Sequence, residues 1–200
     1  MNIQIFDSVL PQEEVNFIEE TLVNTMFPYY SIVDGFTSPP QSYLHNKKDK
    51  RHKEHDFLVH ILYTYEYDTR TAIENSKWSY VADKVLKLFT LATGYQIGKL
   101  FRAKVNYYGQ CNYMKEGDYN TPHLDMDHPH QVLLYYVNDS DGPTYFFDDD
   151  YKIIKVVEPK KGRFILFDGY ITHASSFPIK SNFRVGLNVD CLIDNYDTQI

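Results

Sequence analysis

The first half of the chain carries two helical patterns of apolar residues and one extended pattern. Apolar positions recur at helical spacing over residues 15–23 and again over residues 79–93, after which Gly94 is placed to end the second helix. Pro11, followed by acidic residues at 13 and 14, favours a helix start at that point. Residues 57–65 predict a strand. The pattern therefore predicts two helices and a strand before residue 98.

From about residue 99 the pattern changes to short β-branched and aromatic runs that are separated by turn residues. The strands predicted from these runs cover residues 101–108, 131–137, 144–147, 153–157, 164–167, 172–177 and 183–193. Many short strands at this spacing are typical of a sandwich or jelly roll. We find no internal repeat and expect one domain over residues 1–200. In it, residues 1–98 support a β core at residues 99–193, and the helices pack on one sheet.

Composition supports a folded, β-rich chain. Aromatic residues make up 16% of it, including 18 Tyr and 13 Phe, which excludes wholesale disorder and suits pleated sheets. The net charge of −7 makes a nucleic-acid partner unlikely, because phosphate backbones would be repelled.

The chain shows no signal for secretion or membrane insertion. Its N-terminus lacks the basic and apolar regions of a secretory signal, and no apolar run approaches the roughly 18–20 residues that span a bilayer. The two cysteines, Cys111 and Cys191, form no CxxC pair, as is usual in a reducing compartment. We therefore expect a soluble, cytoplasmic protein without a membrane partner, and no pattern assigns an oligomeric state.

Three polar segments leave alternatives open. Residues 34–56 predict a solvated loop, and their basic run at 47–53 could instead form a mobile lid or a patch for an anionic partner. The acidic run at 148–150 predicts a hairpin turn, because it lacks the spacing of a calcium loop. His128 and His130 predict a solvated turn, with a second site or a substrate contact as the alternative.

The candidate metal ligands are His123, Asp125 and, far downstream, His173. Residues two apart in an extended strand project from one face, so His123 and Asp125 can bind one ion together. Two histidines and one carboxylate on one side of a metal leave its other positions open, which favours non-haem Fe(II). A His-x-Asp triplet also arises by chance in a chain rich in both residues, so its surroundings must supply the specificity.

Those surroundings contain further elements in a fixed order. They are Tyr107-Tyr108-Gly109, Tyr135-Tyr136-Val137-Asn138, Gly142-Pro143-Thr144-Tyr145-Phe146, Pro159-Lys160-Lys161-Gly162-Arg163, and Arg184, eleven residues after His173. With them the sequence resembles the Fe(II)/2-oxoglutarate-dependent oxygenases, specifically the prolyl-4-hydroxylase-like group. The resemblance spans about residues 101–192, with Gly142-Pro143 standing where that group usually has Gly-Gly.

The resemblance implies a double-stranded β-helix, also called a jelly roll or cupin-like core, and assigns roles to six residues. His123, Asp125 and His173 would be the iron ligands. Arg184 would hold the distal carboxylate of 2-oxoglutarate, since its planar fork matches a carboxylate. Tyr136 would help to hold that carboxylate. Tyr107 would line the same pocket, with Tyr108 as the competing register.

Two kinds of neighbour complete the expected site. Asn188 shares the strand face of Arg184 and is predicted to point into the site. Phe146 and Phe167 are expected on strands beside the pocket, and residues 34–56 and 111–122 at its mouth.

The implied activity is hydroxylation of a C–H bond in a peptidyl substrate, prolyl included, or in a small molecule. It would require Fe(II), 2-oxoglutarate and O2, with ascorbate as an optional reductant, and would release succinate and CO2. Two other classes stay open: a catalytically inactive metal-binding jelly-roll module, and a zinc hydrolase that uses the same ligands. The nucleic-acid demethylases of the superfamily usually carry a second arginine six residues after the first, where this chain has Asp190.

Overall fold

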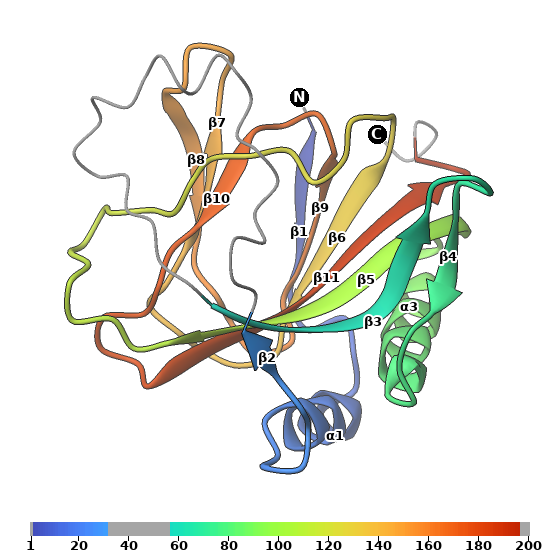
Figure 1. The fold of residues 1–200 in the computed structure, drawn as a ribbon, viewed down its shortest axis with the longest axis horizontal. Coiled ribbons are helices and arrows are strands. Elements are labelled where there is room, and N and C mark those ends of the chain that lie inside the picture. Colours follow the sequence, from blue (N-terminus) through green and yellow to red (C-terminus); the bar gives the residue numbers. More distant parts are fainter. Residues whose placement is uncertain (1, 32–56, 197–200) are drawn as a thin grey trace.

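The computed structural model describes residues 2–31 and 57–196, in which strands predominate and pair into two antiparallel sheets (Figure 1). The segment predicted as a solvated loop, residues 34–56 with its basic run at 47–53, lies outside the described residues. The eight-stranded sheet has the order β1-β9-β6-β11-β5-β3-β2, with β4 paired to β3, and the three-stranded sheet has the order β10-β7-β8. The strand bounds are β1 Ile3–Phe6, β2 Tyr30–Ser31, β3 Leu58–Glu66, β4 Thr71–Glu74, β5 Ile97–Gly109, β6 Gln131–Tyr136, β7 Thr144–Phe147, β8 Ile153–Val157, β9 Phe164–Asp168, β10 His173–Ser175 and β11 Phe183–Ile193.

Both predicted helices are present and cover one face of the large sheet. They are α1, Gln12–Leu22, and α3, Ser79–Thr93. Gly94 ends α3 with a φ of 80°, a left-handed conformation that glycine adopts without steric cost. The buried residues of the two helices and the sheet residues that face them form a single core. It includes Val85 and Phe89 of α3, Leu133 of β6, and Val185 and Leu187 of β11. The prediction of a mostly β fold with helices packed on one sheet is confirmed.

The predicted strands of the second half are confirmed, with differences at their ends. β7, β8 and β11 have the predicted bounds, β5 starts four residues earlier, and β10 is shorter. The predicted turn at 148–150 is also confirmed, because Asp148 Oδ1 accepts hydrogen bonds from the N–H groups of Asp150 and Lys152 at 3.0 and 2.8 Å, between β7 and β8.

The two faces of the large sheet differ at its centre, where β5 and β11 pair. Successive side chains of a strand point to opposite faces. Val185, Leu187, Val189 and Cys191 of β11 enter the helix-side core. The intervening Arg184, Gly186, Asn188 and Asp190 therefore lie on the inner face, which is turned toward the small sheet.

Farther along the large sheet, the inner face is apolar. Side chains of β6 and β9 meet those of the small sheet in a second core, whose buried members are Val132, Leu134, Tyr136, Phe146, Val157, Ile165, Phe167 and Ile171. The space between the sheets is thus closed by packing on one side and lined by polar groups on the other. Within the described ranges, no helix has the length and apolarity needed to cross a membrane.

Candidate metal centre

A single β-bridge brings the two candidate histidines together. The N–H of His123 donates to the carbonyl of His173 at 2.9 Å, and the N–H of His173 donates to the carbonyl of His123 at 3.1 Å. Their ring centroids lie 4.7 Å apart. Asp125 follows two residues later, and one ligand atom from each of the three residues lies within 4.8 Å of the others. The structure therefore gathers the predicted triad, although His123 lies in an isolated bridge rather than in a strand.

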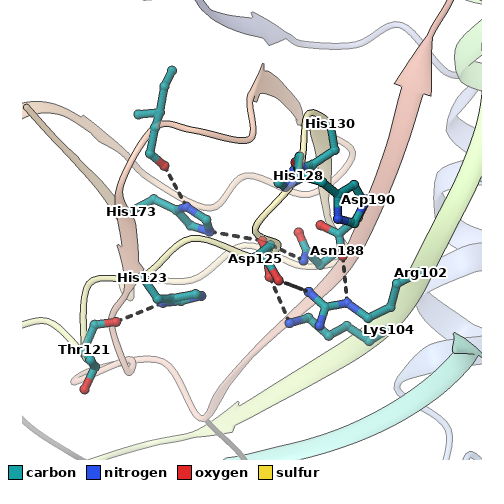
Figure 2. A network of polar contacts seen from close by, with 11 residues as sticks. Arg102, Lys104, Thr121, His123, Asp125, His128, His130, His173, Asn188 and Asp190 are labelled. Atoms are coloured by element: carbon teal, nitrogen blue, oxygen red, sulfur yellow. Dashed lines mark hydrogen bonds and ion pairs between the residues drawn. The ribbon is translucent and has the colours of Figure 1, made fainter. Parts of the chain in front are cut away.

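Each histidine is fixed through its Nδ1. His123 Nδ1 lies 2.9 Å from the carbonyl oxygen of Thr121, and His173 Nδ1 lies 3.1 Å from that of Ile171 (Figure 2). A carbonyl only accepts, so each Nδ1 donates and Nε2 is the nitrogen left for a metal. His173 is also held by packing, since its ring lies 4.9 Å from that of Phe167.

The pKa of His123 is low for a histidine. Burial, followed by repulsion from His173, lowers the pKa of His123 to about 4. At neutral pH this imidazole is therefore uncharged, which is the form that binds a metal.

Asp125 is held by groups from three elements. Its Oδ1 accepts hydrogen bonds from Arg102 Nη2 at 2.8 Å and Lys104 Nζ at 3.2 Å. Its Oδ2 lies 3.2 Å from Asn188 Nδ2 and 3.3 Å from His173 Nε2. Burial alone would raise the pKa of Asp125, but the charge of Lys104 and the contacts of His173 and Arg102 hold it well below its usual range. Asp125 is therefore an anion, as a metal ligand must be.

Arg184 lies in a second polar cluster on the same inner face. Only 3% of the residue is exposed. Its Nη2 donates to Thr144 Oγ1 at 2.9 Å and its Nη1 to the carbonyl of Ser176 at 3.3 Å. Within the described part of the chain its buried Nε has no hydrogen-bond partner. A guanidinium buried with an unused donor is energetically costly and fits an acceptor such as a carboxylate.

Two tyrosine rings enclose this guanidinium. Its central carbon lies 4.9 Å from the ring centroid of Tyr108 and 5.5 Å from that of Tyr136. The Tyr136 hydroxyl is 2.6 Å from Thr144 Oγ1, so Tyr136, Thr144 and Arg184 form one connected group. The structure places Tyr136 beside Arg184, as the resemblance implied.

The prediction that Tyr107 faces this pocket is wrong. Tyr107 packs on Tyr29 and Phe183 at 5.2 and 5.7 Å, on the helix side of the sheet. The reason is strand alternation: Ala103 and Val105 of β5 are buried in the helix-side core, so the odd-numbered residues face that way. Tyr108, the alternative register, is the tyrosine that contacts Arg184.

The prediction of a solvated turn holds for the exposed Asp127 and the half-buried His128 and is wrong for His130. His130 is 1% exposed, and its Nδ1 donates to the carbonyl of His128 at 2.7 Å. Its ring fills the space in front of Gly169, where a Cβ would lie 2.3 Å from it. His128 is stacked on Tyr65 with ring centroids 5.2 Å apart. Neither joins a metal-binding group, because the triad is the one such group among residues 2–31 and 57–196.

A polar strip connects the triad with Arg184. On β11, Arg184 and Asn188 are four residues apart, a Cα separation of roughly 13 Å in an extended strand. Gly186 between them has no side chain, and the residue paired with it on β5 is Asn106. Asn106 is buried, and its Oδ1 lacks a partner among the described residues. Arg184, Asn106 and Asn188 therefore form a line of buried polar side chains along the inner face.

Sequence reasoning missed Arg102, Lys104 and Asp190, which surround the carboxylate ligand. Arg102 and Lys104 lie on β5 and pair with Asp190 and Asn188 of β11. The sequence shows that Arg102 and Lys104 alternate with apolar residues. Only the pairing of β5 with β11 shows that their side chains reach Asp125.

The fold resembles that of known oxygenases, although comparison of sequences finds no relative. No family model matches the chain, and no curated protein matches it. An oxidoreductase of the 2OG-Fe(II) oxygenase family from Burkholderia pseudomallei superimposes with a TM-score of 0.62 and 12% identity, over 95% of this chain and 84% of that one. A Pseudomonas putida prolyl-4-hydroxylase gives a TM-score of 0.53 and 13% identity, over 95% and 91% of the two chains.

A third solved structure has a peptide bound. It is a Trichoplax adhaerens prolyl hydroxylase in complex with a peptide fragment of the hypoxia inducible factor oxygen degradation domain. Its TM-score is 0.53 at 13% identity, over 98% of this chain and 86% of that one. At such identities the likeness shows the fold, and it confirms the predicted jelly-roll architecture of the 2-oxoglutarate oxygenases and prolyl hydroxylases.

Proposed function

We propose that the chain is an Fe(II)- and 2-oxoglutarate-dependent oxygenase that hydroxylates a C–H bond and releases succinate and CO2. The observation that carries this proposal is the combination, between the two sheets, of a His-Asp-His triad with a buried arginine. The triad alone would suit several metals and reactions. The arginine adds a site for a carboxylate within reach of the metal, which a purely structural metal site does not need.

The residues present fit Fe(II) as a donor set. Two imidazole Nε2 atoms and one carboxylate oxygen on one side of an ion, with open positions opposite, form the arrangement found in non-haem Fe(II) oxygenases. When bound, Fe(II) supplies the redox chemistry that couples decarboxylation of 2-oxoglutarate to transfer of an oxygen atom from O2 to the substrate. His123, Asp125 and His173 would hold it.

The chain itself binds and orients the cosubstrate in this scheme. Arg184 would pair with the distal carboxylate of 2-oxoglutarate, using the buried guanidinium and its unused Nε. Tyr136, whose ring lies beside the guanidinium, would help to hold the same carboxylate, and Tyr108 would form one wall of the pocket. Phe146 and Phe167 pack beside His173 and exclude water from that side.

Peptidyl substrates, prolyl included, are the first class to test, with small molecules second. The P. putida neighbour is a prolyl-4-hydroxylase and the T. adhaerens neighbour has a peptide fragment bound. A nucleic-acid substrate is disfavoured. Where nucleic-acid demethylases usually carry a second arginine, this chain has Asp190, which is buried and paired with Arg102. Ascorbate would serve as an optional reductant.

Two alternatives make different predictions in one assay. A zinc hydrolase would need no 2-oxoglutarate, and an inactive metal-binding module would bind metal without turnover. Purified protein is incubated with Fe(II), 2-oxoglutarate and O2, and succinate is measured while proline-containing peptides and small metabolites are added in turn. We expect succinate that depends on Fe(II), rises with one substrate class, and disappears in Asp125→Ala. Metal binding with no succinate under any substrate would contradict the proposal.

A further inference from the structure

One carboxylate oxygen of the candidate ligand Asp125 contacts two cationic side chains. Arg102 and Lys104 both contact Oδ1, at 2.8 and 3.2 Å, and both come from the inner face of β5 (Figure 2). Asp190 lies behind them on β11 and pairs with Arg102 Nε through its Oδ2 at 2.7 Å. Asp190 thus contacts the ligand set only through Arg102.

We infer that Asp190 is a positioning residue for the metal centre: it holds Arg102 so that Oδ1 of Asp125 stays occupied and Oδ2 alone faces the metal. The inference rests on the proposed function to the extent that the triad binds a divalent metal. It adds a charge pair, Asp190 with Arg102, whose role is to fix the geometry of the carboxylate ligand.

The strand pairing makes this arrangement specific. Arg102 lies directly opposite Asp190 in the β5–β11 ladder, so the two side chains meet on the inner face. The guanidinium then uses a second nitrogen, Nη2, for both Oδ1 and the main-chain carbonyl of Asp125, the latter at 3.3 Å. One planar group therefore fixes the side chain and the backbone of the ligand together.

Burial argues that the pair serves more than stability. The side chain of Asp190 is fully buried, and its Oδ1 lacks a hydrogen-bond partner within the described residues. A buried ion pair often stabilises a fold no better than apolar residues of similar size, because desolvation offsets the attraction. Val189 and Cys191, the neighbours of Asp190 on the strand, show that apolar residues suit this strand on its other face. The pair is therefore better explained by the ligand that it holds.

The consequence for the metal concerns the number of open positions. A carboxylate whose Oδ1 is held by two cations binds through Oδ2 only, and Oδ2 lies on the side of His173 Nε2, at 3.3 Å. A carboxylate free to bind through both oxygens would take a further position. Keeping Asp125 to one oxygen leaves that position for the cosubstrate or O2.

The test is the affinity of the protein for Mn²⁺, followed by the electron paramagnetic resonance signal of the free ion. In Asp190→Asn, Arg102 is held less firmly and its charge is no longer compensated, and both changes disfavour a cation at Asp125. We expect the dissociation constant for Mn²⁺ to rise by about tenfold to a hundredfold, the usual effect of removing an outer partner of a metal ligand. Asp190→Glu keeps the carboxylate and should recover part of the loss.

The matched control is another aspartate–arginine pair outside the site. Asp7, which follows β1, contacts Arg163, which precedes β9, at 2.7 and 2.8 Å. Asp7→Asn should leave Mn²⁺ affinity unchanged. Thermal unfolding of each metal-free variant is measured in parallel. An Asp190→Asn protein that unfolds at a lower temperature but binds Mn²⁺ as the wild type does would overturn the inference, because Asp190 would then be structural only.

A second comparison covers the case in which Asp190→Asn fails to fold. Arg102→Met and the double variant Arg102→Met/Asp190→Asn both lack Arg102, so neither leaves an unpaired arginine beside the site. If Asp190 acts through Arg102, the two variants bind Mn²⁺ equally, within about threefold. A larger further loss in the double variant would overturn the inference.

Measuring Mn²⁺ binding and succinate formation together distinguishes failure of this inference from failure of the proposed function. Wild-type protein that binds Mn²⁺ at the triad and forms no succinate would count against the oxygenase proposal alone. Wild-type protein that binds no Mn²⁺ would overturn both.

Discussion

The two faces of β5 and β11 are built from the same strands and serve different ends. On the helix side, Val185, Leu187 and Val189 are at most 1% exposed and pack against apolar helix residues. On the inner side, Arg184, Asn188 and Asp190 are buried almost as deeply, although they are polar or charged. Burying such groups is costly unless each is paired, so a fold that retains several of them on one face has a functional use for that face. The difference teaches that one face provides stability and the other provides chemistry.

The largest expected effect is on the inner face at the triad. His123→Ala removes one of the three metal ligands, so we expect loss of Mn²⁺ and Fe(II) binding and of any succinate formation. His60→Ala is the matched control, since His60 is buried between Pro28 and Ser76 at another place in the sheet. It should lower stability and keep metal affinity. Equal metal affinity in His123→Ala and wild type would contradict the assignment of the inner face.

On the helix side, a large effect is expected on stability rather than on metal binding. Leu187→Ala should lower the free energy of unfolding by about 2–5 kcal/mol, because the side chain is fully buried and its removal leaves a cavity. The folded variant should bind metal as the wild type does. Chemical denaturation and Mn²⁺ titration measure the two quantities. A loss of metal affinity comparable to that in His123→Ala would show that the two faces are not separable.

A narrower effect is expected within the inner face, at the guanidinium. Arg184→Ala should weaken 2-oxoglutarate binding by roughly a hundredfold, since truncating one partner of a buried charge pair costs about 2–5 kcal/mol. Metal affinity should change little, because Arg184 contacts none of the triad. Calorimetric titration of the Mn²⁺-loaded protein with 2-oxoglutarate measures this. Equal weakening of both ligands would contradict a separate role for Arg184.

The smallest expected effect is on the pH dependence of stability. The pKa of His123 is about 4 in the folded protein and near 6.5 in an unfolded chain. The unfolded chain therefore binds the proton first as the pH falls, and the metal-free protein should lose stability between about pH 6.5 and pH 4. His123→Asn should show a shallower loss in that window, whereas Leu187→Ala should keep the wild-type slope. Identical slopes in His123→Asn and wild type would contradict the low pKa.

The sequence predicted the parts of the fold that depend on long periodic patterns. The two helices and the strands after residue 130 have strong apolar periods, and the structure has them close to the predicted bounds. The strands β1, β2 and β4, of two to four residues, were missed. Strands as short as these show no clear period of their own, and β7 and β10 were found because they lie in a run of evenly spaced strands.

The sequence named residues that the structure brings together where residue types are distinctive, and missed their neighbours where strand register decides. The triad and Arg184 could be named because their residue types and order match a known pattern. Tyr107 and Tyr108 are the same residue type, and only pairing with β11 shows which one meets Arg184. Arg102, Lys104 and Asp190 could not be found for the same reason, because the contacts of Arg102 and Lys104 with Asp125, and of Asp190 with Arg102, are set by cross-strand neighbours rather than by spacing along the chain.

The most direct test of the central claim is an anaerobic spectrum of the protein with Fe(II) and 2-oxoglutarate. The claim is that the polar groups between the two sheets hold a metal and the cosubstrate together. It predicts a visible metal-to-ligand charge-transfer band that needs both additions. The band should be absent in His123→Ala, require more 2-oxoglutarate in Arg184→Ala, and be unchanged in Tyr107→Phe, whose ring faces the helices. No band in the wild type, or an undiminished band in His123→Ala, would contradict the claim.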